Sequence, residues 1–473
     1  MFRKECLFKF FPMKKHFVLF LCLLTIVLWN GSCNNDPKTD PCETDPQPGC
    51  PNYVDPCETD PQPGCPNYVD PCEDDPQPGC PNYDPETPVL GNTITIATVD
   101  YAIDETKIEK IDDGFWYMSI QLKNATKPLV IHTLRYTTTT TGYSIETWVG
   151  NDSITGKERP SAMADRYEKA GRQVRMAING GFYGTDVTGT PISMQATKGL
   201  LTFLPVDNYP IIGFDNQNLP YMDSVRLNSK MKIEKNNSEW DIISINGGRW
   251  TDFLVLYNEY KGKRTNTNPW GIEVLCEPVA AKWNELDNHI NVRCKVEQVA
   301  TQGNMEIPKG KIVLSGHGTA HTYMSTLQAD DYVSVTVDYA LKTKPEITSA
   351  TIRNVVSGWN IILNQNNIVP PPGWEAAIED NSHPRTCVGF TNDKKYVFFT
   401  VVEGRNPTQA NPDISAGVST TELAQVMQYF GAQNAINLDG GGSSCIMIDK
   451  ETKNFLSDGA QRAVADGLAI IKK

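Results

Sequence analysis

Four glycine-punctuated segments place polar side chains directly after apolar, strand-like runs. They are residues 177–184, 384–386, 403–405 and 437–444. A glycine-rich turn at the end of a strand exposes backbone N–H groups and lets a ligand approach the backbone closely. Asp439 stands in such a turn, where a carboxylate can do acid–base or nucleophilic work, and arginine side chains supply the planar, permanently charged fork that a phosphate group needs. The four segments therefore indicate a ligand site, and a phosphate-containing ligand is one that such a fork could bind.

Each of these residues also has an ordinary structural explanation when it is taken alone. Asp439 could accept the N–H groups of its own turn, Asn179 could be a buried turn residue, and Arg385 could be a solvated surface cation. The choice depends on whether the segments act together. Their order along the chain is therefore the stronger evidence.

The joint pattern resembles one known family. The chain has Asn-Gly-Gly-Phe-Tyr at 179–183, Pro-Arg-Thr at 384–386, Asn-Leu-Asp-Gly-Gly-Gly-Ser-Ser at 437–444 and Arg-Ala-Val-Ala-Asp-Gly at 462–467. This order, with a strand ending in Glu403-Gly404-Arg405 and a helix between, is similar to the phosphodiester glycosidases, which include the uncovering enzyme that removes N-acetylglucosamine from phosphomannose. The resemblance runs from about residue 161 to the C-terminus. Family members often have Asp-Gly in place of Glu403-Gly404, so the role of Glu403 is less secure.

The resemblance implies cleavage between the anomeric carbon of a sugar and a phosphate. A phosphate diester already leaves easily, so the reaction needs cations for the phosphate and a carboxylate near the anomeric carbon more than a strong acid. Arg385 and Arg462 are expected to hold the phosphate, with Arg405 as a third cation. Asp439 is expected to act as nucleophile, base or electrostatic stabiliser, with Glu403 as its partner. The other residues expected to orient substrate are Asn179, Gly180, Gly181, Phe182, Thr386, Gly440, Gly441, Gly442, Ser443 and Ser444.

Two other functions are compatible with the same pocket: a non-catalytic glycan-binding surface lipoprotein, and a maintenance factor for exopolysaccharide or cell-wall polymers. The residues predict no cofactor and leave a divalent metal open. His317 and His321 are four apart, as in a helical metal pair, but the glycine-rich run at 316–318 argues against a helix there. Trp359 and Trp374 precede Arg385 and could contact a sugar or belong to the core.

The elements expected to position these residues are mostly strands. Runs rich in Ile, Val, Tyr and Thr predict strands at 92–99, 116–122, 128–134, 311–315, 332–339 and 396–402. Apolar stripes predict helices at 161–171 and 420–431. We expect an α+β fold with a mixed, mainly antiparallel sheet or sheets and a few flanking helices. Strands at 270–277 and 289–298 are expected to pair, and Cys276 and Cys294 could form a disulfide across them.

The N-terminal part predicts export and a stalk. Residues 1–32 resemble a lipoprotein signal peptide that ends before Cys33, the expected lipidated residue, so we expect an outer-membrane or cell-surface lipoprotein that meets the membrane through its lipid alone. Residues 33–88 contain three Pro-, Cys- and acid-rich repeats of 15 residues, which predict a disordered stalk stiffened by disulfides. Residues 89–160 are a β-rich segment, either a small domain or the first strands of the catalytic domain at 161–473.

Charge separates the two parts and excludes one class of partner. Residues 34–88 hold thirteen acids and one base, a net −12 of the total −13, so the rest of the chain is close to neutral. Nucleic-acid recognition normally needs a basic face. We therefore expect a sugar-phosphate or phosphodiester-linked glycan as partner, and no nucleic acid.

Overall fold

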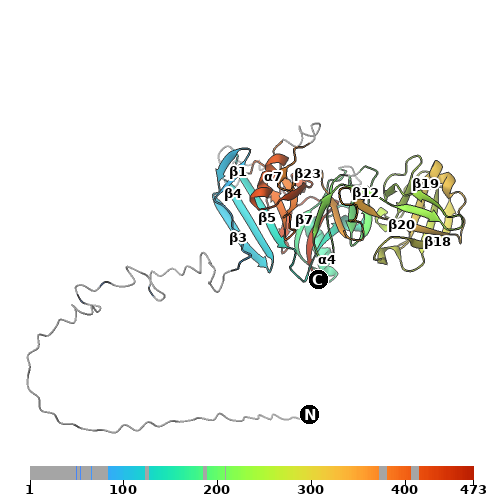
Figure 1. The fold of residues 1–473 in the computed structure, drawn as a ribbon, viewed down its shortest axis with the longest axis horizontal. Helices are drawn as coiled ribbons and strands as arrows, with labels where there is room; N and C mark the ends of the chain where they lie inside the picture. The colour runs from blue at the N-terminus through green and yellow to red at the C-terminus, as the bar shows by residue number, and fades with distance from the viewer. Residues whose placement is uncertain are drawn as a thin grey trace, which may run out of the picture. The chain divides into compact units, whose positions relative to one another are not determined.

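The computed structural model describes residues 84–122, 127–184, 189–207, 209–371, 381–405 and 415–473, and Cys50, Val54 and Cys65. The signal peptide, the lipidated Cys33 and nearly all of the stalk predicted from the sequence lie outside the described residues. Cys50 and Cys65 are disulfide-bonded, as was predicted for the repeat cysteines. From Glu86 onward the chain forms one compact unit, Glu86–Lys473, coloured blue to red in Figure 1.

Two sheets share the hydrophobic core that lies behind the site described below. The larger has eight strands in the order β24-β23-β27-β25-β26-β5-β4-β3, and the smaller has five in the order β29-β28-β7-β30-β6. One buried cluster joins them, with Phe399 and Ile436 from the first sheet and Ile178 and Leu468 from the second. The bounds are β3 (Glu105–Asp112), β4 (Phe115–Leu122), β5 (Leu129–Thr137), β6 (Tyr143–Val149), β7 (Gln173–Asn179), β23 (Asn360–Asn364), β24 (Asn367–Ile368), β25 (Arg385–Phe390), β26 (Tyr396–Val402), β27 (Asn434–Asn437), β28 (Ile446–Ile448), β29 (Glu451–Thr452) and β30 (Asp466–Lys472).

Two helices and a hairpin cover the outer faces of these sheets. Helix α7 (Thr420–Tyr429) packs on the eight-stranded sheet together with β1 (Thr93–Ile96), which pairs with β2 (Val99–Ala102). Its N-terminus is closed by a capping box between Ser419 and Glu422. Helix α4 (Pro160–Lys169) packs on β7 through Met163 and Ala164.

The middle of the chain adds a second group of strands, labelled β12, β18, β19 and β20 in Figure 1. An eight-stranded sheet has the order β14-β13-β20-β18-β17-β19-β16-β15, and a five-stranded sheet has the order β11-β10-β22-β8-β9. Their bounds are β8 (Gln195–Thr197), β9 (Leu200–Phe203), β10 (Ile211–Phe214), β11 (Pro220–Asp223), β13 (Lys230–Ile233), β14 (Ser238–Asp241), β15 (Ser244–Ile245), β16 (Leu254–Tyr257), β17 (Gly271–Pro278), β18 (Val292–Ala300), β19 (Ile312–His317), β20 (Tyr332–Thr336) and β22 (Asn354–Ser357), with β12 (Val225–Leu227) and β21 (Tyr339–Leu341) forming a separate pair.

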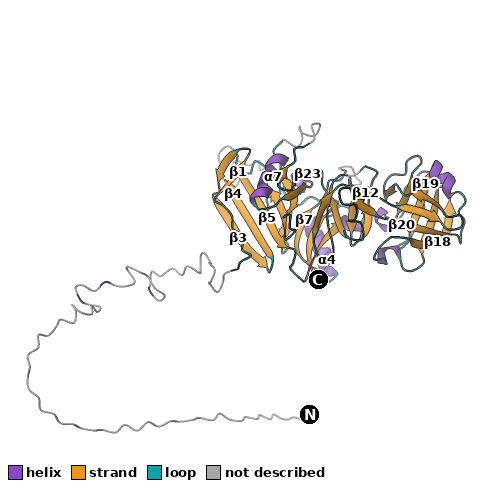
Figure 2. Cartoon of the chain, in the orientation of Figure 1, coloured by secondary structure: helices purple, strands orange, loops and turns teal. Residues whose placement is uncertain are grey.

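The predicted fold class is confirmed: strands dominate, nearly all pairs are antiparallel, and the helices are few (Figure 2). Residues 89–160 supply strands to both main sheets, so their β3 to β6 are built into the same body as the later strands. Two predicted strands are each split in two. The run at 92–99 turns at Ala97 and Thr98, which have positive φ angles of 49° and 68°, and the run at 332–339 divides into β20 and β21.

The disulfide expected between Cys276 and Cys294 is wrong, since both are free, buried thiols. Strands β17 and β18 do pair antiparallel, but Cys276 lies opposite Val296 and Cys294 opposite Pro278, with a register shift after Leu275. The two cysteines are therefore diagonal neighbours, whose Cβ atoms lie roughly 7 Å apart, whereas a disulfide needs about 3.8 Å.

The glycine-rich run at 316–318 is not helical, as the sequence indicated, and a short helix begins directly after it. Helix α5 (Thr319–Met324) contains His321, while His317 ends β19, so the two histidines do not share a helical face. No helix among the described residues is both long and apolar enough to cross a membrane.

Candidate active site

The segments singled out in the sequence meet at one edge of the two main sheets. Strand β25 begins at Arg385 where its antiparallel partner β27 ends at Asn437. In the smaller sheet, β7 ends at Asn179 beside Gly467, at the start of β30. The backbone N–H of Asp439 donates to the carbonyl of Gly180 at 3.0 Å and so joins the two edges.

A cavity of about 350 Å³ lies at this edge, and we call it the candidate active cavity. It is lined by Phe182, Trp359, His383, Arg385, Arg405, Asp439, Gly440, Gly441, Gly442 and Arg462. The three arginines and the aspartate expected from the sequence therefore surround one space. Their roles in binding and catalysis stay predictions.

Asp439 is the acidic residue among these lining residues. Its pKa is raised from an ordinary 3.8 to about 6, mainly by burial and to a smaller extent by the negative charge of the nearby Asp466. A hydrogen bond from Ser443, the charge of Arg462 and the N–H of Gly440 act in the opposite direction. A carboxylate with this pKa is a stronger base than an exposed aspartate and is still mostly ionised at neutral pH.

Arg462 is held at the opposite side of the glycine turn. Its Nε and Nη2 donate to Asp458 Oδ2 at 2.9 and 2.6 Å, and its Nη1 lies 3.3 Å from Ser443 Oγ. A Cβ at Gly442 would lie 2.1 Å from both Arg462 Nη2 and Asp458 Oδ2. Only glycine therefore lets this ion pair close over the turn.

Arg385 and Arg405 are fixed differently. The Arg385 side chain is buried, and it donates through Nε to the carbonyl of Val418 and through Nη2 to that of Asn381, at 3.1 and 3.0 Å. Arg405 is exposed, has a positive φ of 55°, and places Nη2 3.0 Å from His383 Nδ1. Burial lowers the pKa of His383, and the positive charges of Arg405 and Arg385 act in the same direction.

Asn179, Thr386 and Ser444 form a buried clamp behind the cavity and do not line it. The Asn179 amide donates to the carbonyl of Asp439 at 2.7 Å and accepts from the Thr386 hydroxyl at 2.9 Å and from the N–H of Cys445 at 3.1 Å. Ser444 Oγ lies 3.2 Å from the same Thr386 hydroxyl. These side chains position the turn that carries Asp439, which differs from the direct substrate contact expected from the sequence.

Gly180 and Gly181 shape the backbone next to Asp466. The N–H of Gly181 donates to Asp466 Oδ1 at 2.7 Å, and a Cβ at Gly180 would lie 2.2 Å from that oxygen. The turn therefore needs glycine in order to pack against a buried carboxylate.

Glu403 does not line the candidate active cavity, although the sequence suggested it as the partner of Asp439. Its Oε1 lies 2.8 Å from His132 Nε2 and accepts from the N–H of Phe455 at 2.6 Å. His132 Nδ1 in turn lies 2.7 Å from the hydroxyl of Tyr117. Glu403 thus belongs to a buried hydrogen-bond network with His132 and Tyr117. It directly follows β26 and directly precedes Gly404.

Asp466 is the second carboxylate at the site and was not chosen from the sequence. It is buried, its Oδ2 accepts from Gln195 Nε2 at 2.7 Å, and burial raises its pKa to about 6. The available signal was the Asp-Gly pair that closes the run at 462–467. His383 was also missed, and its only signal was its place immediately before Pro384.

Trp359 lies in the wall of the candidate active cavity. Its ring stacks on Tyr209 with centroids 4.8 Å apart and lies 5.1 Å from that of Phe182. Trp374 lies outside the described residues.

These observations define a class of protein: an α+β domain of two main sheets, with an aspartate surrounded by arginines at one edge. The model of the phosphodiester glycosidase family matches residues 289–471, so this part of the chain is similar to that family. The matched part contains Arg385, Asp439 and Arg462.

Individual relatives are distant. The chain is 36% identical over 88 residues to the SPbeta prophage-derived uncharacterized protein YomE of Bacillus subtilis (strain 168), a match that covers 19% of this chain and 13% of that protein. A hypothetical protein from Synechocystis has a similar fold, with a TM-score of 0.60, 15% identity, and coverage of 78% of this chain and 64% of that chain. A protein described as exported, from Burkholderia pseudomallei K96243, gives a TM-score of 0.56, 18% identity, and coverage of 73% and 74%.

Proposed function

We propose that the chain hydrolyses the bond between the anomeric carbon of a sugar and a phosphate, in a surface, dietary or host glycan or in a cell-envelope polymer. The observation that carries this proposal is the single cavity in which Asp439 lies among Arg385, Arg405 and Arg462. Guanidinium groups suit the non-bridging oxygens of a phosphate diester. The carboxylate suits the positive charge that develops on the sugar ring.

Asp439 is proposed to act as a base for water. The water oxygen attacks the anomeric carbon, and the bond from that carbon to the phosphate oxygen breaks with its electron pair staying on the phosphate. The water proton passes to Asp439 and then to solvent. The products are a free sugar and a phosphate monoester, whose added negative charge the arginines stabilise.

The aromatic part of the wall is proposed to hold the sugar. Trp359 and Phe182 offer ring surface at the cavity, and such rings commonly pack against the C–H faces of a pyranose. The arginines and the glycine turn then face the phosphate. This division of the cavity explains why one wall is apolar and another cationic.

The proposed location is the cell envelope, with Cys33 as the lipid anchor and residues 33–88 as a spacer. The sequence of residues 1–33 supports it, and a protein of similar fold is described as exported. Radiolabelled palmitate incorporation into the native chain, and its loss in Cys33→Ala, would test the anchor.

The activity is tested with synthetic methyl phosphodiesters of glucose, mannose, galactose and N-acetylglucosamine, in both anomeric forms, in ¹⁸O-labelled water. We expect release of the sugar from at least one ester, with the label in the sugar and none in the phosphate. Label in the phosphate would identify a phosphodiesterase instead. If binding occurs but no ester is cleaved, the chain captures glycans and the enzymatic proposal is wrong.

A further inference from the structure

A second cavity, of about 480 Å³, lies where α4 and β6 meet the turn between β8 and β9 and the short 3-10 helices η2 (Glu259–Lys261) and η3 (Trp283–Glu285). We call it the α4 cavity. It shares no lining residue with the candidate active cavity. Its volume is within the range of about 300–1,000 Å³ typical of small-molecule sites.

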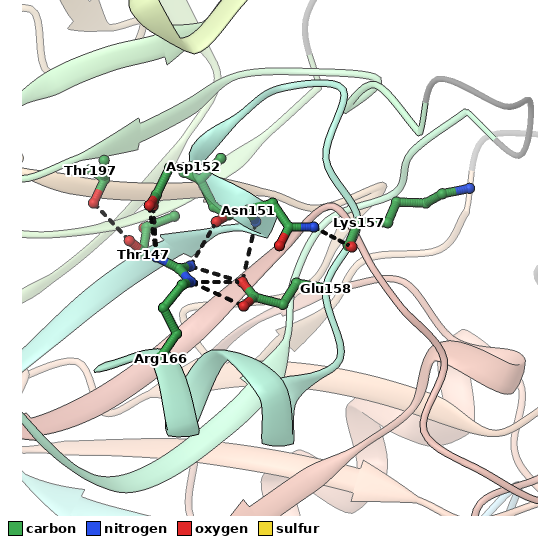
Figure 3. Close-up of polar contacts among 8 residues, drawn as sticks. Thr147, Asn151, Asp152, Lys157, Glu158, Arg166 and Thr197 are labelled. Atoms are coloured by element: carbon green, nitrogen blue, oxygen red, sulfur yellow. Dashed lines mark hydrogen bonds and ion pairs between the residues drawn. The ribbon is translucent and has the colours of Figure 1, made fainter. Parts of the chain in front are cut away.

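Two buried polar atoms among the residues lining the α4 cavity lack a hydrogen-bond partner: Thr147 Oγ1 and Asn284 Oδ1. Thr147 is fully buried. Its backbone groups are satisfied, because its N–H donates to Asn354 Oδ1 and its carbonyl accepts from Thr197 Oγ1 at 2.7 Å (Figure 3). The hydroxyl is therefore its one open group, and buried polar groups are normally paired.

The two arginines that line the α4 cavity are already engaged with carboxylates. Arg166 donates through Nε and Nη2 to Glu158 and through Nη1 to both oxygens of Asp152, at 2.8 to 3.3 Å (Figure 3). Arg172 is paired through Nη2 with Glu146 Oε1. A phosphate or carboxylate would have to displace these carboxylates, so the cavity does not suit an anion.

Two tyrosines complete the polar wall. The guanidinium carbons of Arg166 and Arg172 lie 5.2 and 4.8 Å from the centre of the Tyr167 ring, which fixes that side chain. Among the described residues, neither the Tyr167 nor the Tyr260 hydroxyl has a hydrogen-bond partner, although both line the cavity. Two phenols are thus without a partner at the cavity, and the unpaired Thr147 hydroxyl and Asn284 carboxamide oxygen, which are buried in its wall, can pair with a ligand once their side chains turn toward it.

We propose that the α4 cavity binds a neutral carbohydrate of one or two sugar units. Sugars carry closely spaced hydroxyl groups that both donate and accept, which matches this set of neutral partners. The inference is independent of the proposed hydrolysis. The two cavities are nonetheless connected through the backbone. Glu158, which binds Arg166, forms two backbone hydrogen bonds with Val464, and Val464 is two residues from Arg462.

The test is saturation-transfer NMR and calorimetry on the full chain with a library of neutral mono- and disaccharides, and with glucuronic acid and glucose 6-phosphate as charged probes. We expect at least one neutral sugar to bind. Thr147→Val keeps the side-chain shape and removes the open hydroxyl, so affinity for that sugar should fall about tenfold, by the worth of one hydrogen bond. The melting temperature of the free variant should stay the same or rise.

Thr420→Val is the matched control, since Thr420 Oγ1 is also buried without a partner and lies outside the α4 cavity. It should leave sugar affinity unchanged. Trp359→Ala separates the two cavities, because sugar binding at the α4 cavity should survive it. The proposal is overturned if no neutral sugar binds, if only the charged probes bind, or if Thr147→Val binds as tightly as the native chain because the space holds only water.

Discussion

The candidate active cavity and the α4 cavity contain similar residue types arranged to opposite effect. In the α4 cavity, Arg166 is enclosed by Glu158 and Asp152. In the candidate active cavity, Arg385, Arg405 and Arg462 share the wall with one carboxylate, Asp439. The first arrangement leaves Arg166 without net positive charge. In the second, even with Asp458 paired to Arg462, three arginines outnumber two carboxylates and keep positive charge for a ligand.

The difference shows that arginine content alone does not identify a phosphate site. What matters is where the neighbouring carboxylates lie. A guanidinium that is bonded to two carboxylates has no N–H donor left for a ligand, and it contributes to the stability of the fold. Arginines that outnumber the acids around a cavity keep a net positive charge, which attracts an anion. Arginine variants in the candidate active cavity should therefore lower activity, whereas arginine variants in the α4 cavity should lower stability.

The largest expected effect comes from Asp439→Asn. Loss of the base should lower kcat by about a thousandfold. At pH 7 the same variant should unfold at a higher temperature than the native chain. The reason is that folding raises the pKa of Asp439 from 3.8 to about 6, so the folded state loses stability relative to the unfolded state as pH rises through that range and the buried group ionises.

Steady-state kinetics and thermal unfolding at pH 5 and pH 7 measure both effects. The stabilisation should be larger at pH 7. A variant that keeps more than a tenth of the native kcat would remove Asp439 from the chemistry.

A pair of matched arginine variants tests the comparison directly. Arg462→Lys removes the planar group that binds Asp458 through Nε and Nη2 while Nη1 remains for a phosphate, so KM should rise about 10- to 100-fold with a small change in stability. Arg166→Lys breaks a largely buried ion-pair network, in which Glu158 is 6% exposed, so the free energy of unfolding should fall by about 2–3 kcal/mol while kcat/KM stays within about twofold of the native value.

Denaturant unfolding gives the free energy of unfolding of each variant, and steady-state kinetics gives its kcat/KM. If Arg166→Lys lowers kcat/KM as much as Arg462→Lys does, without loss of stability, the α4 cavity takes part in the reaction and the contrast between the cavities is wrong.

Glu403→Gln addresses the carboxylate that the sequence suggested as a second catalytic group. Because Glu403 bonds to His132 and Phe455 and does not line the candidate active cavity, activity should stay within about threefold of the native value, and the free energy of unfolding should fall by about 1–2 kcal/mol. Asp439→Asn is the matched comparison. A hundredfold loss of kcat in Glu403→Gln would restore it as the catalytic partner.

The sequence predicted the backbone of the site better than its side-chain directions. Antiparallel pairing brings the start of β25 and the end of β27 to one edge, so motifs at those strand ends were bound to meet once the strands were recognised. The side chain of Glu403 is different, because its partner His132 is 271 residues away in sequence. No local pattern reveals such a contact.

Register was the other feature that could not be predicted. The strands containing Cys276 and Cys294 were correctly paired, but a shift after Leu275 set the thiols diagonally. A change of one or two residues in register leaves composition and periodicity of each strand untouched, so the sequence of either strand alone does not encode it.

The smallest expected effect concerns pH and the buried Asp466. In the native chain, kcat/KM should rise through about pH 6 as Asp439 ionises, and level off above it. Asp466 raises the pKa of Asp439 by charge repulsion, so Asp466→Asn should move the midpoint to lower pH. The asparagine oxygen can still accept the N–H of Gly181, which keeps the turn in place. A pH profile of kcat/KM for both proteins measures the shift, and a midpoint that moves upward would mean that Asp466 acts on the turn geometry and not through its charge.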